Sequence, residues 1–209
     1  MYRIVFLLLG SIWVLSCTQN KNEISSLPYY NEPTFTPIFE DSTPINHTIG
    51  DFSFLDQDSL LVSQENIEGK IHIANFIFTI CGSICPTMTA NMKMVSDNLE
   101  ADIDLVLLSY SVTPWFDKPF VLKKYKSDHN ITNPNWHFLT GSKNEIYKLA
   151  RQSYFAEEDI GFSKDSTEFL HTEHFILVDK TKRIRGIYNG TLALEMLQLI
   201  DDIKTLKAE

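Results

Sequence analysis

The sequence predicts an α/β fold, a sandwich with a central mixed sheet and an added N-terminal β-hairpin. Between residues 71 and 151, apolar runs of strand length alternate with segments of helical spacing, as in parallel strands joined by helices. Residues 174–179 and 184–189 then form two apolar runs around a Lys-Thr-Lys turn, which predicts a hairpin. With 44% hydrophobic residues, the 209-residue chain can bury the core of one domain.

The elements can be placed in order along the chain. Residues 52–62 read as a strand, an acidic turn and a second strand, and residues 71–80 form a buried strand. Pro86 opens a helix that continues to Leu99, because proline is tolerated in a first helical turn. The remaining elements are strands at residues 103–111, 136–140, 174–179 and 184–189, and helices at residues 118–126, 142–151 and 192–206. This order is that of a thioredoxin-like sandwich.

The first 17 residues have the features of an export signal. An apolar run from residue 4 to residue 15 has the length of a signal-peptide core and is short for a membrane-spanning helix. The segment Val14-Leu15-Ser16-Cys17 resembles a bacterial lipobox, so residues 1–17 are predicted to be a lipoprotein signal peptide with lipidation at Cys17. An uncleaved N-terminal anchor is the alternative. Residues 18–44 are polar and contain several prolines, so we expect them to form a tether. Residues 45–209 are expected to form the folded domain. We therefore expect a membrane-anchored protein of the cell envelope, with its domain in the periplasm.

The charge of the chain excludes one class of partner. The formal net charge is −9, and no cluster of Lys and Arg offers a footprint for phosphates. Nucleic acid is therefore not an expected partner.

Cys81 and Cys85 carry the main chemical signal. Because Cys17 falls in the leader, the body of the chain holds one close pair of cysteines, which indicates a redox or metal site. The pair is expected at a strand-to-helix turn, where the helix dipole favours thiolate over thiol. On one helical face, side chains four residues apart lie about 5–6 Å from each other, close enough to bind one ion. Two such thiolates can form a disulfide or bind a soft metal, namely Cu(I), zinc or an iron–sulfur cluster.

Five segments in the same order resemble a known family. They are residues 51–58, residues 69–88 with the motif Phe76-Ile77-Phe78-Thr79-x-Cys81-x-x-x-Cys85-Pro86-x-Met88, residues 111–125, residues 136–141 and residues 171–179. Together they resemble the Sco (SenC-type) copper-binding proteins, over about residues 45–189. This resemblance implies a membrane-tethered, thioredoxin-like domain that serves the copper A centre of cytochrome c oxidase.

The resemblance also implies a ligand set for copper. It assigns Cys81, Cys85 and His171 as the ligands, because the family places its histidine four residues before the position of Phe175. The nearby His174 already belongs to the strand alternation and is interpreted as a strand residue. Two Cys and one His are too few for a closed structural zinc site, which takes four ligands, and they suit Cu(I).

The sequence departs from the family pattern at two places. Residues 82–84 are Gly-Ser-Ile, where the family often has a triplet like Pro-Asp-Val. Residues 169–170 are Phe-Leu, where Val-Asp is usual. The second change removes an acidic neighbour that could orient the imidazole of His171.

Two functions remain open at this point. The first is a copper metallochaperone, not an enzyme in the turnover sense, that binds Cu(I), with Cu(II) as a second state, and passes it to the oxidase copper A subunit. The alternative is a thiol–disulfide oxidoreductase, in which Cys81 or Cys85 attacks a disulfide of the oxidase or of another exported protein, and His171 is dispensable. A peroxiredoxin would leave the Cys pair and the downstream His unexplained. Further expected partners are a periplasmic thiol reductant or another copper carrier, and the membrane through the lipid.

Overall fold

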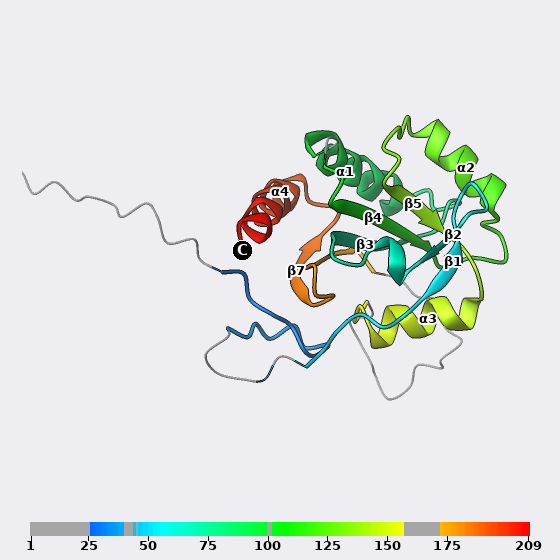
Figure 1. Ribbon diagram of the computed structural model, residues 1–209. Helices are drawn as coiled ribbons and strands as arrows, with labels where there is room; N and C mark the ends of the chain where they lie inside the picture. The colour runs from blue at the N-terminus through cyan, green and yellow to red at the C-terminus, as the bar shows by residue number, and fades with distance from the viewer. Residues whose placement is uncertain (1–25, 40–43, 45, 100–101, 157–171) are drawn as a thin grey trace, which may run out of the picture.

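A five-stranded mixed sheet forms the centre of the protein (Figure 1). The computed structural model describes residues 26–39, 44, 46–99, 102–156 and 172–209. The strand order is β5-β4-β3-β6-β7. β5, β4 and β3 are parallel to one another, and β6 is antiparallel to both of its neighbours, β3 and β7. The strands are β3 (Ile71–Ile77), β4 (Leu105–Ser111), β5 (Trp136–Leu139), β6 (His174–Val178) and β7 (Ile184–Asn189).

Helices cover both faces of this sheet, which confirms the predicted thioredoxin-like sandwich (Figure 1). One face packs against α1 (Ile84–Asn98), α2 (Pro119–Asp128) and α4 (Ala193–Ala208). The other face packs against α3 (Lys143–Gln152) and the predicted N-terminal hairpin of β1 (Ser53–Leu55) and β2 (Leu61–Ser63), which is followed by the short 3₁₀ helix η1 (Gln64–Asn66). Within the described part of the chain, no helix has both the length and the apolar composition needed to cross a membrane.

The central strands β3 and β4 are buried along their whole length because both of their faces are covered. In β3, Ile71 and Ile73 point to the core beneath α1, whereas Ala74 and Phe76 point to the core above α3. This alternation follows from the two-residue period of a strand, and covered faces on both sides explain why apolar residues point to both faces of the sheet.

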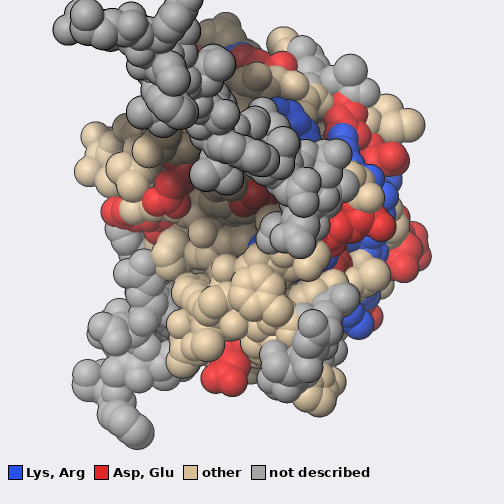
Figure 2. Space-filling model, turned by 90° about the vertical axis from the view of Figure 1, so that its left-hand side faces the viewer, with Lys and Arg blue, Asp and Glu red and all other residues tan. Residues whose placement is uncertain are grey.

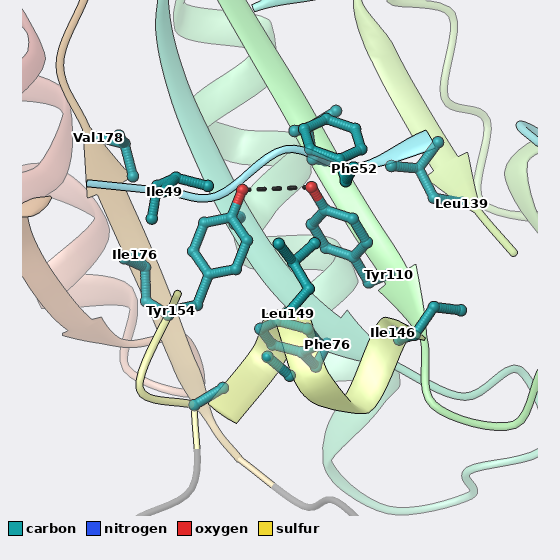
Figure 3. Close-up of a cluster of buried hydrophobic side chains, with 14 of the residues drawn as sticks. Ile49, Phe52, Phe76, Tyr110, Leu139, Ile146, Leu149, Tyr154, Ile176 and Val178 are labelled. Atoms are coloured by element: carbon teal, nitrogen blue, oxygen red, sulfur yellow. Dashed lines mark hydrogen bonds between the residues drawn. The ribbon is translucent and has the colours of Figure 1, made fainter. Parts of the chain in front are cut away.

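The core on the α3 side contains a short chain of buried polar groups (Figure 3). The hydroxyls of Tyr110 and Tyr154 lie 3.2 Å apart, and the Tyr154 hydroxyl lies 3.2 Å from Nε2 of His72. All three side chains are fully buried. The ring of Phe76 stacks on Tyr110, with centroids 5.4 Å apart. These contacts place an ionisable histidine inside an otherwise apolar and aromatic cluster.

Residues 26–39, here called the N-terminal segment, lie against the edge strand β7 (Figure 1). The buried guanidinium of Arg185 holds this segment by donating a hydrogen bond of 2.7 Å to the carbonyl of Leu27. It also forms ion pairs with Glu209 at 2.7 Å and Asp179 at 3.3 Å, and it stacks on the ring of Tyr29 at 4.0 Å. One side chain therefore joins the N-terminal segment, β7 and the end of α4.

Charged side chains are spread unevenly over the surface. On the face drawn in Figure 2, acidic side chains flank a broad uncharged area, while Lys and Arg gather towards one margin. This view agrees with the acidic balance of the whole chain, whose formal net charge is −9.

Candidate functional site

The two cysteines lie where the chain passes from β3 into α1. β3 ends at Ile77 and α1 begins at Ile84, so the strand is shorter and the helix starts earlier than the sequence analysis predicted. Cys81 is partly exposed in the connecting loop, and Cys85 is buried in the first turn of the helix. Both are free thiols. The prediction of two cysteines on one helical face is therefore wrong in detail, because Cys81 precedes the helix.

The environments of the two thiols differ in their effect on acidity. Burial raises the pKa of Cys81, but hydrogen bonds from the backbone N–H groups of Cys85, Ser83 and Ile84 outweigh it, so the pKa falls below its usual value. The Cys85 side chain also donates a hydrogen bond to Cys81. Burial, together with the neighbouring Cys81 and Asp117, raises the pKa of Cys85 to about 12, although a hydrogen bond with the backbone of Phe78 acts in the opposite direction.

The helix N-terminus thus favours thiolate at Cys81 and not at Cys85, which corrects the expectation for the pair. N–H groups of the first turn point at the Cys81 sulfur, whereas the Cys85 sulfur lies inside the domain. Chemically, the site presents one accessible sulfur of thiolate character with a second, protonated sulfur directly behind it. Such a pair can bind a soft metal ion or close to a disulfide.

Asp117 is a buried carboxylate beside the Cys loop that the sequence analysis did not single out. Its side chain is fully buried and accepts hydrogen bonds from the hydroxyls of Thr79, Ser111 and Thr113 at 2.5 to 2.8 Å. The backbone N–H of Thr79 donates another, at 3.3 Å. Because Thr79 stands two residues before Cys81, this carboxylate ties the Cys loop to the loop that follows β4.

A pattern in the sequence could have indicated that this place needs a buried acceptor. Thr79, Ser111 and Thr113 are hydroxyl residues at the carboxyl ends of two apolar runs. Adjacent parallel strands bring such ends together, and several hydroxyl donors need an acceptor when they are buried. The sequence offers many carboxylates, and only the packed structure selects Asp117 as that acceptor.

The third predicted ligand cannot be placed in this arrangement. His171 lies outside the described residues, as does Cys17. His174 is at the start of β6, where its ring packs edge-on against Phe35 at 5.5 Å, so the structure confirms it as a strand residue. Among the residues that the structure describes, no three His, Cys, Asp or Glu side chains come together as a metal-binding group. The described part of the site is therefore the pair Cys81 and Cys85, whose sulfur donors fit a soft ion.

Comparisons with known proteins agree on one family. A family model described as SCO1/SenC matches residues 40–208. The SCO1 protein homolog of Bacillus subtilis (strain 168) is 37% identical over 164 residues, which cover 78% of this chain and 84% of that protein.

Solved structures are similar in fold and sequence. A SCO1/SenC family lipoprotein from Bacillus anthracis str. Ames is 30% identical, with a TM-score of 0.68 over 80% of this chain and 99% of that chain. BsSco, a member of the Sco family of cytochrome c oxidase assembly proteins in which a disulfide switch was identified, is 34% identical, with a TM-score of 0.67 over 81% of this chain and 99% of that chain. The match extends over most of each protein, so the chain belongs to the SCO1/SenC family.

Proposed function

We propose that this protein is a membrane-tethered copper metallochaperone. It binds copper as cargo through Cys81, Cys85 and His171 and delivers it to the copper A centre of cytochrome c oxidase. The observation that carries this proposal is the reduced pair of cysteines, with one sulfur accessible at the end of the strand and the other behind it. Soft sulfur donors select Cu(I), and an accessible sulfur suits a protein that must release its ion again.

Two relatives support the proposed copper acceptor and the proposed attachment to a membrane. A relative of known structure belongs to a family of cytochrome c oxidase assembly proteins, which supports the oxidase copper A subunit as the acceptor. Another relative is a lipoprotein, which supports lipidation at Cys17 and a domain held at the membrane. We place this domain in the periplasm. The acyl chains on Cys17 would supply the anchor and residues 45–209 the copper-binding domain. Residues 18–44 would supply the tether, part of which, residues 26–39, packs on the domain. In this role the protein moves an ion and is not an enzyme in the turnover sense.

One observation favours the second candidate, a thiol–disulfide oxidoreductase. The lowered pKa of Cys81 and the adjacent Cys85 thiol are what an exchange reaction needs, namely an attacking thiolate and a resolving thiol. BsSco, which is similar to this chain, has a disulfide switch. This reaction has no use for the imidazole of His171, whereas copper binding does.

The deciding experiment measures copper binding by the reduced soluble domain, with His171→Ala beside the wild type. We expect one copper per monomer, and a loss of affinity of at least about 10- to 100-fold in the variant, with the Cys81–Cys85 disulfide still able to form. His174→Ala is the matched control, because this neighbouring histidine packs on Phe35, and it should leave the affinity unchanged. If both variants bind copper as the wild type does while thiol exchange persists, the oxidoreductase is the better description.

A further inference from the structure

Four large apolar side chains are exposed on segments at the same end of the sheet as Cys81. The exposed fractions are 61% for Ile80, 55% for Trp115, 48% for Phe116 and 73% for Phe120. We call these four residues the apolar rim. Ile80 directly precedes Cys81, the next two follow β4, and Phe120 is in the first turn of α2. Single exposed apolar side chains are common on protein surfaces, but a patch of several usually marks an interaction site.

The segments that carry the apolar rim are fastened to one another beneath it. Asp117 joins the loop after β4 to the Cys loop through Thr79, as described above. α2 is joined to α1 by a hydrogen bond of 2.7 Å between the hydroxyls of Tyr125 and Thr89. The rim and the Cys loop therefore belong to one connected group of segments at the carboxyl ends of β3 and β4.

The exposed charge in the described loops that carry Cys81 and the apolar rim is cationic. In residues 78–83 and 112–118, the charged residues are Asp117, which is fully buried, and Lys118, which is exposed. The ammonium group of Lys143 lies 5.3 Å from the ring of Trp115. The described part of this surface is thus apolar with two cationic side chains beside it, although the chain carries a formal net charge of −9. It is complementary to an apolar surface bordered by carboxylates.

We propose that the apolar rim is the docking surface for the copper acceptor, a protein whose soft-ligand site lies in an apolar surface bordered by carboxylates. This inference rests on the proposed function, because ligand exchange brings the acceptor's donor atoms to bonding distance of the ion at Cys81. For each copper–sulfur bond that forms, one breaks. Copper keeps its oxidation state, and the proton of the incoming thiol passes to the departing sulfur. An acceptor that approaches this closely covers the side chains on both sides of Cys81.

The test measures the affinity of the copper-free reduced domain for the soluble copper A domain of cytochrome c oxidase from the same organism. Phe120→Ser should weaken binding about tenfold or more, because a large aromatic side chain at an interface loses its burial. Ile103→Ser is the matched control, since Ile103 is 77% exposed in the turn before β4, at the opposite end of the sheet, and should have no effect. Raising the salt concentration or introducing Lys118→Glu should slow association.

The outcomes separate this inference from the proposed function. Equal affinity of wild type and Phe120→Ser, or no binding of the wild-type domain to the copper A domain, would overturn the docking surface. Binding that depends on Phe120 without any transfer of copper from the loaded wild-type protein would instead support the surface and refute the chaperone. Because Phe120 is mostly exposed, the variant should keep the wild-type unfolding temperature, and this measurement verifies its fold.

Discussion

Protonation of a single buried histidine should make the protein less stable in mild acid. His72 is fully buried in β3, with Nε2 against the hydroxyl of Tyr154, in the cluster shown in part in Figure 3. Burial lowers its pKa from 6.5 to about 3, although the negative charge of Asp179 acts in the opposite direction. The folded protein therefore holds His72 neutral at pH values where an unfolded chain protonates it.

The size of the effect follows from these two pKa values. Above pH 6.5 both states are neutral and His72 costs nothing. As the pH falls from about 6.5 towards 3, the unfolded state gains a proton that the folded state does not bind, and unfolding becomes easier. At pH 5 the loss amounts to about 2 kcal/mol relative to pH 7, since each pH unit in this window is worth about 1.4 kcal/mol.

The assay compares urea unfolding of the wild type and of His72→Asn at pH 7 and pH 5. Asparagine can still bond to Tyr154 but does not titrate, so its packing cost appears at both pH values and cancels in the difference. We expect the wild type to lose about 2 kcal/mol more than the variant between pH 7 and pH 5. Equal losses in the two proteins would refute the reasoning, because they would show that His72 is not held neutral by the fold.

Three further predictions concern the site and the N-terminal segment. Asp117→Ala should lower the free energy of unfolding by about 3 kcal/mol, because it leaves buried hydroxyls without an acceptor. As a control, Asp97→Ala removes an exposed carboxylate and should lower the free energy of unfolding by less than about 0.5 kcal/mol. Urea unfolding measures both values. A brief iodoacetamide pulse at pH 7, read by mass spectrometry, should label Cys81 well before Cys85, and equal labelling would contradict the assigned pKa directions. Arg185→Ala should speed cleavage within the N-terminal segment in limited proteolysis, because the carbonyls and carboxylates that the guanidinium binds lose their partner; an unchanged cleavage rate would show that other contacts hold the segment.

Much of the fold could be predicted because local signals and packing agree. The apolar run of β3 has strand length and is followed by Pro86, so both the strand and the helix were expected, with errors of three residues at the end of β3 and two at the start of α1. Those errors fall in the loop that holds Cys81, where backbone N–H groups turn towards the sulfur instead of continuing the strand. Such a loop has no periodicity from which its ends could be read.

The site was less predictable, because its chemistry depends on contacts between distant residues. The spacing of Cys81 and Cys85 is the same whether both lie on a helix or one precedes it, so the sequence could not separate their acidities. Asp117 acts through residues up to 38 positions away, and no local pattern marks it among the other carboxylates. The assignments of His171 and Cys17 fall outside the described residues and stay predictions.

The hydrogen bond from Arg185 to Leu27 limits the distance between the domain and a membrane to which the N-terminus would be attached. If Cys17 carries the proposed lipid, ten residues separate it from Leu27, and a chain of this length reaches at most about 35 Å. Arg185 is level with the start of β3, since Ile184 pairs with Val178 and Val178 with His72. Cys81 follows the other end of this seven-residue strand, about 20 Å away. Such a short connection at one end of the sheet would leave the cysteine end facing away from the bilayer. A target in the same membrane would then be reached by tilting of the domain and not by a search over a long distance.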